Sequence, residues 1–252
     1  MSQKIYSIIQ ARGGSKGVPG KNIKFLGGYP VIAYSIAASK LSKRISRNIV
    51  STNSPEISEI AKKYGAEVPF IRPEEFAQDN STDLDVFTHA IKWLEENEGD
   101  LPDLLVQLRP ATPLRDPIMM DSAIEKLGAD PRATSLRSAH KLAEPPQKMF
   151  KIGEGGYWTG FFPDDPRPEY YNLPRQSFPT AFHPNGYVDI VRPDFIKQNP
   201  GLFYGQKSLA FETPFTIEID TPEDVEYLEY IFTKKQDNSV YDYLKANFKK
   251  EN

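Results

Sequence analysis

The chain has 252 residues, which is enough for one large α/β domain or for one domain with a sizeable insertion. It contains no cysteine, which excludes disulfides, thiolate catalysis and zinc–thiolate sites. Its net charge of −3 argues against general nucleic-acid binding. Because no signal peptide and no apolar run of membrane-spanning length is visible, we expect a soluble, cytoplasmic protein.

The first predicted element is a short buried strand, Ile5 to Ile9, which leads into a glycine-rich loop with the sequence QARGGSKGVPGKN. Four glycines in this loop allow positive φ and let backbone N–H groups approach a ligand. The loop also carries three cations, namely Arg12, Lys16 and Lys21. Backbone donors combined with fixed positive charge favour polyphosphate binding over a merely flexible surface turn.

The loop does not match the two common nucleotide-binding motifs. It is not a P-loop, because Asn22 follows Lys21 where that motif requires Ser or Thr. It also lacks the G-x-G-x-x-G spacing, and no acidic residue near 30–50 is available for a ribose. The first acidic residue is Glu56, whereas nine lysines and arginines precede it. This distribution indicates a cationic N-terminal face for a small anionic ligand.

After the loop, predicted helices and strands alternate along the chain as far as the middle of the sequence. Alternation of this kind predicts a Rossmann-like α/β fold, with a mostly parallel sheet flanked by helices and right-handed crossovers. Hydrophobic spacing and helix caps place the elements at helix Val31–Leu41, strand Asn48–Ser51, helix 55–64, strand Leu104–Leu108, and helices 83–96 and 117–127.

The composition changes at about residue 140, where proline, glycine and aromatic residues become frequent until about residue 184. A stretch of this length is seldom a single structureless loop, so we expect an inserted β-rich arm, about 140–180, within one domain of residues 1–252. We expect strands at 186–191 and 216–220 and helices at 222–232 and 239–248 in the remaining sequence.

Glu218 and Asp220 alternate with isoleucines, so a strand would project both carboxylates from one face. Such a pair suits Mg²⁺, although Asp220 could instead stabilise the N-terminus of the next helix and Glu218 could be solvated. Arg115 could hold an anionic group bidentately or form a surface salt bridge. No Ser-His-Asp order or Cys-His pair is present, which disfavours covalent hydrolase chemistry.

Over nearly its whole length, the chain resembles the CMP-sialic acid synthetase family, the acylneuraminate cytidylyltransferases. The opening loop resembles the signature of that family, and further matching motifs follow in order along the chain. They are VSTNS at 50–54, GAEVPFIRP at 65–73, QDNST at 78–82, RPATPLR at 109–115, PRQ at 174–176, NG at 185–186 and EIDT at 218–221.

This resemblance implies a transfer of CMP from CTP to the anomeric hydroxyl of an acidic nine-carbon 2-keto sugar, with Mg²⁺ or Mn²⁺ as cofactor and pyrophosphate as product. It implies a homodimer formed through the 140–180 arm. It implies catalytic roles at the triphosphate for Arg12, Lys16 and Lys21, and nucleotide contacts from Ala11, Gly13, Ser15, Asn22, Arg72 and Ser81. The implied sugar-binding residues are Gln107, Arg109, Arg115, Lys148, Arg175 and His183, and the implied metal ligands are Asp220 and Glu218.

The chain differs from the usual family pattern at three positions. Arg109 stands where the family usually has glutamine, Glu218 where it usually has aspartate, and His183 where it often has arginine. The acceptor therefore stays open among N-acetylneuraminate, legionaminate, pseudaminate and an eight-carbon relative such as Kdo. A nucleotidyltransferase that uses another nucleotide such as GTP, and a non-catalytic nucleotide-binding homologue, are the alternatives.

Overall fold

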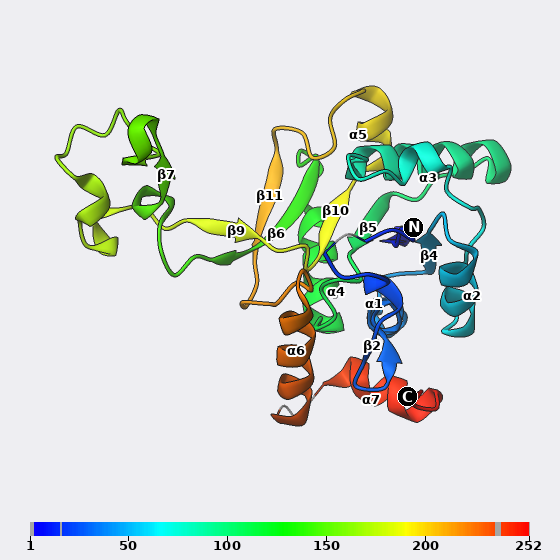
Figure 1. The fold of residues 1–252 in the computed structure, drawn as a ribbon. Coiled ribbons are helices and arrows are strands. Elements are labelled where there is room, and N and C mark those ends of the chain that lie inside the picture. The colour runs from blue at the N-terminus through cyan, green and yellow to red at the C-terminus, as the bar shows by residue number, and fades with distance from the viewer. Residues whose placement is uncertain (1–2, 16, 235–237, 252) are drawn as a thin grey trace.

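The computed structural model describes residues 3–15, 17–234 and 238–251, and within them a seven-stranded mixed sheet forms the centre of the molecule. Six strands follow the order β11-β6-β10-β5-β1-β4, and β9 pairs with β6 (Figure 1). The strands are β1 Ile5–Gln10, β4 Arg47–Ser51, β5 Leu104–Leu108, β6 Ser135–Lys141, β9 Phe182–Pro184, β10 Asp189–Val191 and β11 Ser208–Glu212.

Five of the seven strands of this sheet run in the same direction, namely β1, β4, β5, β6 and β11, as the alternation of elements predicted. β1 runs parallel to both β4 and β5, and β6 runs parallel to β11. β10 lies antiparallel between β5 and β6, and β9 is antiparallel to β6. The predicted mostly parallel α/β sheet is therefore confirmed.

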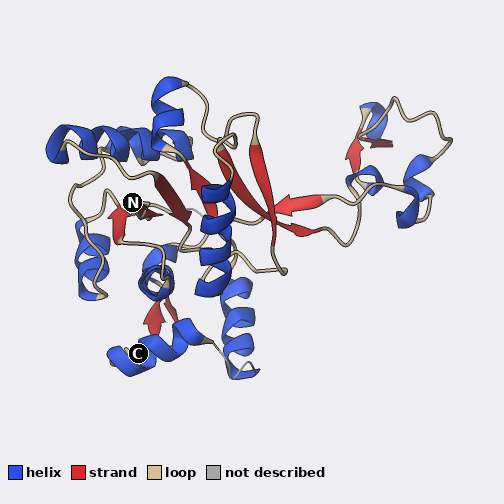
Figure 2. Ribbon diagram, turned by 180° about the vertical axis from the view of Figure 1, so that it is seen from behind, coloured by secondary structure: helices blue, strands red, loops and turns tan. Residues whose placement is uncertain are grey.

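Helices cover both faces of the sheet (Figures 1 and 2). Along β1, Ile5 and Ile9 belong to the core under α1 (Val31–Leu41), whereas Tyr6 and Ile8 belong to the core under α3 (Asp83–Glu98). This period of two is what a strand buried on both faces requires. The helices are α1 Val31–Leu41, α2 Pro55–Lys63, α3 Asp83–Glu98, α4 Pro117–Ala129, α5 Pro193–Gln198, α6 Pro222–Lys234 and α7 Ser239–Asn247. None of the helices within the described residues has the length and apolar character needed to span a membrane.

The predicted last strand, Thr216–Asp220, is wrong. It forms no strand, and the edge of the sheet beside β6 is occupied instead by β11, which the sequence did not reveal. Segment 216–220 crosses the ends of the strands, where the buried Ile219 donates its N–H to the carbonyl of Ala111 at 2.8 Å. The alternation of Ile and acidic residues therefore reflects a segment with one side buried, with Ile219 in the core and Ile217 packed against it, rather than a strand in the sheet.

The predicted inserted arm lies between β6 and β9 and projects away from the sheet (Figure 1). It contains an antiparallel hairpin of β7, Phe150–Ile152, and β8, Trp158–Gly160. Large apolar side chains remain exposed on it, with Trp158 71% and Tyr157 77% accessible. A separate short hairpin, β2 Phe25–Leu26 with β3 Tyr29–Pro30, follows the N-terminal loop.

The segment that follows β5 is held by Arg115, whose side chain is buried beneath it. The Arg115 guanidinium donates to five oxygens, which are the carbonyls of Tyr187, Thr112, Arg109 and Gly186 and the hydroxyl of Ser35. All five of its N–H donors are thereby used. Arg115 is 3% accessible, so the predicted contact with a sugar does not fit. Its role is to hold the loop in place.

We therefore expect Arg115→Met to lower the free energy of unfolding by at least about 3 kcal/mol, because several buried carbonyl oxygens lose their donor. Urea denaturation measures this change. Arg132→Met is the matched control, since Arg132 is exposed and pairs with Asp130 alone in the described part of the chain, and it should change stability by no more than about 0.5 kcal/mol. An Arg115→Met variant of unchanged stability would contradict the structural role.

Candidate active site

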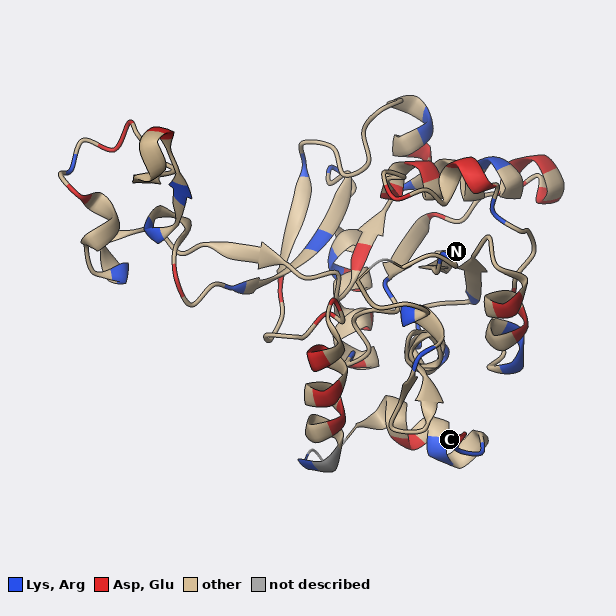
Figure 3. Cartoon of the chain, in the orientation of Figure 1, with Lys and Arg blue, Asp and Glu red and all other residues tan. Residues whose placement is uncertain are grey.

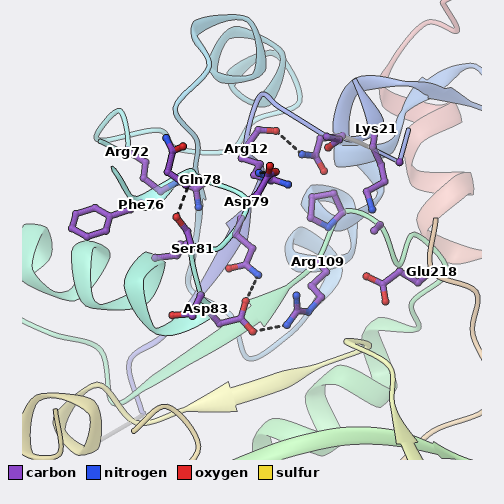
Figure 4. Close-up of a pocket in the computed structure, with 18 of the residues that line it drawn as sticks. Arg12, Lys21, Arg72, Phe76, Gln78, Asp79, Ser81, Asp83, Arg109 and Glu218 are labelled. Carbon is purple, nitrogen blue, oxygen red and sulfur yellow. Dashed lines mark hydrogen bonds and ion pairs between the residues drawn. The ribbon is translucent and has the colours of Figure 1, made fainter. Parts of the chain in front are cut away.

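A pocket of about 460 Å³ opens at the carboxyl ends of β1 and β5, the edge at which open α/β sheets bind ligands. Four segments line it: the loop after β1, residues 72–86, residues 109–111 and the carboxylates at 218 and 220 (Figure 4). These segments are far apart in the sequence, so the fold rather than local structure assembles the pocket.

The pocket brings together nine of the residues predicted from the sequence. They are Arg12, Ser15, Lys21, Asn22, Arg72, Ser81, Arg109, Glu218 and Asp220. Lys16 lies outside the described residues. Ala11 and Gly13 belong to the same loop but do not line the pocket: Ala11 is buried with its N–H on the carbonyl of Ser51, and the Gly13 N–H donates to Asn53 Oδ1.

The loop glycines act differently from the prediction. Of the four, only Gly20 has a positive φ, at 65°. Gly17 is required for another reason, because a Cβ at this position would lie 2.7 Å from the backbone oxygen of Asp220. The loop thus packs directly against the segment that carries the two carboxylates, and Asn22 Nδ2 holds it by donating to the Arg12 carbonyl at 2.9 Å.

Two cations of the loop form ion pairs across the pocket. Arg12 Nη1 lies 2.7 Å from Asp79 Oδ1, and Lys21 Nζ lies 3.2 Å from Asp220 Oδ1. The carboxylate side chains are well exposed, at 46% for Asp79 and 69% for Asp220. Pairs as exposed as these contribute only about 0–1 kcal/mol to stability. The two carboxylates are therefore counter-ions that a more highly charged ligand can displace, and they contribute little to the stability of the fold.

Arg72 differs from these cations because it has no carboxylate partner among the described residues. Its side chain is 3% accessible, and its Nε is buried without a hydrogen-bond partner in the described part of the chain. Burial, followed by repulsion from Arg12, lowers the pKa of Arg72 to about 10, so it stays charged at neutral pH. A buried guanidinium with a free donor at the pocket wall is suited to bind an acceptor oxygen of a ligand.

Arg109 is held in a fixed position by several segments. Its guanidinium lies 2.5 Å from Asp83 Oδ2, and Gln10 Nε2 donates to the other oxygen of Asp83 at 2.7 Å. Its aliphatic stem passes over Gly186, where a Cβ would lie 2.6 Å from Arg109 Cδ and where φ is +58°. Burial alone would lower the pKa of Arg109, but the carboxylates around it, Asp83 foremost, raise it.

The sequence prediction missed the acidic partners Asp79 and Asp83. Both lie in or next to the QDNST segment that leads into α3, from which only Ser81 was predicted as a site residue. The absence of acidic residues before Glu56 was the available signal, since loop cations can then pair only with later segments. Acidic residues do gather along α3 and α6 (Figure 3).

Glu218 and Asp220 both line the pocket, although the segment that carries them is not the strand that their alternation predicted. Among the described residues, Asp220 pairs with Lys21, whereas Glu218 forms no ion pair or hydrogen bond. No cluster of three or more His, Cys, Asp or Glu side chains suited to a metal occurs within the described ranges. The protein thus offers two carboxylates, and any further ligands of a metal ion would have to come from a substrate or water.

The other predicted sugar-binding residues do not line this pocket. Gln107 is 1% accessible within β5, where its Oε1 accepts from the Tyr204 hydroxyl at 3.4 Å. Lys148 and Arg175 lie in the arm, and Lys148 Nζ donates to the Leu173 carbonyl. His183 lies in β9, with its ring 5.5 Å from that of His140. Within one chain, these residues lie outside the pocket lining.

Known proteins resemble this chain in both sequence and fold. A sequence model of the cytidylyltransferase family matches residues 6–150. The chain is 30% identical to post-translational flagellin modification protein B of Campylobacter coli, over 92% of this chain and 96% of that protein. It is also 30% identical to CMP-N,N'-diacetyllegionaminic acid synthase of Campylobacter jejuni, again over 92% of this chain and 96% of that protein.

N-acylneuraminate cytidylyltransferase of Escherichia coli is 30% identical over 95% of this chain, which spans 55% of that longer protein. Among solved structures, a CMP:2-keto-3-deoxy-manno-octonic acid synthetase complexed with CTP superposes with a TM-score of 0.67 at 18% identity, over 92% of this chain and 99% of that one. That likeness supports the fold. The family model and the full-length relatives, together with the pocket, show that this chain belongs to the cytidylyltransferase family.

Proposed function

We propose that the chain transfers CMP from CTP to the anomeric hydroxyl of an acidic 2-keto sugar of the nonulosonic type. The sugar oxygen forms a bond to the α-phosphorus while the bond from that phosphorus to the bridging oxygen breaks. Pyrophosphate leaves with the electron pair, and the hydroxyl proton passes to solvent. The pocket carries this proposal, because it combines cations with two carboxylates at the strand ends of a chain that belongs to this family.

The loop cations would bind the triphosphate. Arg12 and Lys21 hold their present carboxylate partners weakly, and a triphosphate carries more negative charge than either partner. In-line displacement at phosphorus needs little covalent help from the protein, so positioning and charge neutralisation account for most of the catalysis. Lys16, in the same loop, is proposed to take part with these two cations.

Arg72 would contact the nucleotide at the other end of the pocket. Its buried, unpaired Nε can donate to an acceptor oxygen, and Ser81 and Asn22 line the same pocket. Burial makes this donor effective, because its charge is less screened there than at the surface. Gly13 and Ala11 would contribute through the backbone of the loop.

The two carboxylates fit a divalent ion that arrives with a triphosphate. An ammonium group already lies 3.2 Å from Asp220 Oδ1, so this oxygen faces a position suited to a cation. Glu218 lines the same pocket without an ion pair among the described residues. Magnesium needs only one or two carboxylates when phosphates complete its coordination. When bound, Mg²⁺ or Mn²⁺ would neutralise charge that builds up on the departing pyrophosphate.

Arg109 would bind the carboxylate of the acceptor. Its guanidinium is fixed by Asp83, and the hydrogen bond from Gln10 to Asp83 orients that carboxylate in turn. An arginine held in this way presents its remaining N–H groups in a fixed direction, which suits a planar carboxylate. The acidic group shared by nonulosonic acids and Kdo is the part of the acceptor that this contact recognises.

Lys148 and Arg175 would reach an acceptor only from a partner subunit. The arm that carries Lys148 and Arg175 projects away from the sheet, and exposed aromatic side chains on it favour association with a second copy (Figure 1). In a two-fold dimer, each arm would lie over the pocket of the other subunit. This arrangement reconciles their proposed role with their distance from the pocket of their own chain.

Pyrophosphate release from each nucleoside triphosphate, paired with several nonulosonic acids and with Kdo, tests the activity. We expect release with CTP and a nonulosonic acid in the presence of Mg²⁺ or Mn²⁺. Lys21→Ala should lower kcat at least about 100-fold, whereas the control Lys24→Ala, at an exposed lysine outside the pocket, should stay near wild type. If no pair released pyrophosphate, the proposed enzymatic activity would be excluded. A preference for GTP would show that the proposed nucleotide is wrong, and a preference for Kdo would show that the proposed acceptor is wrong.

Mixing two inactive variants tests the contribution of the arm. Lys21→Ala and Arg175→Ala should each be nearly inactive, but their co-expressed mixture should recover about a quarter of wild-type activity. Half of randomly formed dimers are mixed, and one of the two sites in each mixed dimer is intact. If Arg175 acted within its own subunit, no mixture would regain activity, so a mixture as inactive as its components would contradict the shared site.

A further inference from the structure

Among the described residues, the pocket draws three cations from the N-terminal loop and from the end of β5, and all three are neutralised before any ligand binds. Each pairs with a carboxylate from a different segment of the chain: Arg12 with Asp79, Lys21 with Asp220, and Arg109 with Asp83. Only one of these carboxylates, Asp220, is also proposed to hold a divalent ion. The same oxygen thus has two competing uses.

The backbone of Asp220 cannot easily move away from Lys21. Its N–H donates to Asp224 Oδ2 at 2.9 Å, and the N–H of Thr221 donates to the same oxygen at 2.7 Å. On the other side, the carbonyl of Asp220 packs closely on Gly17: a Cβ at position 17 would lie 2.7 Å from the carbonyl oxygen of Asp220. The segment is fixed from both sides, so a change at this ion pair has to come from the side chains.

Lys21 is the partner that can move. Its backbone is held in a short 3-10 turn, with its N–H on the carbonyl of Val18 at 3.1 Å. Its four-carbon stem, in contrast, lets the ammonium group rotate to a new partner without any change in the backbone. Its side chain is 20% accessible, so it already reaches the open pocket, where a phosphate would be bound.

We infer that the Lys21 ammonium occupies the cation position at Asp220 in the free protein, and that a triphosphate opens this position by drawing Lys21 away. The inference rests on the proposed function, because it takes Asp220 as a ligand of the divalent ion. An ammonium group and a hard divalent cation seek the same carboxylate oxygen, and both cannot occupy it. The free protein therefore binds the divalent ion poorly, and the two ligands strengthen each other's binding reciprocally.

Binding of Mn²⁺ to the nucleotide-free, full-length protein, followed by the loss of the free-ion EPR signal, tests this inference. Lys21→Met should bind Mn²⁺ at least about ten-fold more tightly than wild type, because Asp220 loses its resident cation. Adding Asp220→Asn to Lys21→Met should abolish the gain. Lys21→Gln is a second variant with the same expectation, should Lys21→Met fold poorly.

Arg12→Met is the matched control. It removes the same charge from the same loop, but the partner of Arg12 is Asp79 and not Asp220. A general effect of charge should be small in this variant, about three-fold or less. Equal Mn²⁺ affinity in wild type and Lys21→Met would overturn the inference, and so would an equal gain in Arg12→Met.

The experiment needs neither acceptor nor turnover, so its outcome is separate from that of the activity assay. A protein that transfers CMP normally, yet binds Mn²⁺ without nucleotide as tightly as Lys21→Met does, would refute only the inference. A protein inactive with every substrate pair, yet showing the gain in Lys21→Met, would refute only the proposed reaction. In wild type, adding a non-hydrolysable CTP analogue should raise Mn²⁺ affinity by at least about ten-fold.

Discussion

The lack of any acidic residue in the first 55 positions is the constraint on which the pocket depends. A cation in this part of the chain can form an ion pair only with a segment that the fold brings near it. Arg12 reaches a carboxylate 67 residues further on, and Lys21 reaches one 199 residues further on. Because of this constraint, the loop forms ion pairs with two other segments that line the pocket. The carboxylates in these pairs are partners that a phosphate can replace.

The elements that are specified by their own local sequence were the most predictable. Val31–Leu41 was predicted at its observed bounds, because proline before its first turn and small apolar residues along it specify a packed helix. Thr216–Asp220 was predicted as a strand because its alternation is real, yet it pairs with no strand. Alternation shows that one side of a segment is buried, but it does not show what covers that side, and here the neighbour is the loop at Ala111.

The sequence allowed the cations and carboxylates of the pocket to be predicted, but not which cation forms an ion pair with which carboxylate. Lys21 and Asp220 were both identified, whereas their contact depends on how a loop after β1 packs against a segment near the end of the chain. Arg115 shows the reverse case. Its residue type suited an anion, but the fold buries it and uses every donor for backbone and hydroxyl oxygens. Burial of a polar side chain is a property of long-range packing, which local patterns do not contain.

A crystal structure of the protein with CTP and Mg²⁺ tests the central claim most directly. The account predicts that the triphosphate lies on Arg12 and Lys21, with Asp220 released from Lys21 so that their closest N–O distance exceeds about 4 Å. Asp220 should then contact the metal ion. A triphosphate bound elsewhere, with the pairs of Arg12 to Asp79 and of Lys21 to Asp220 both intact, would contradict it.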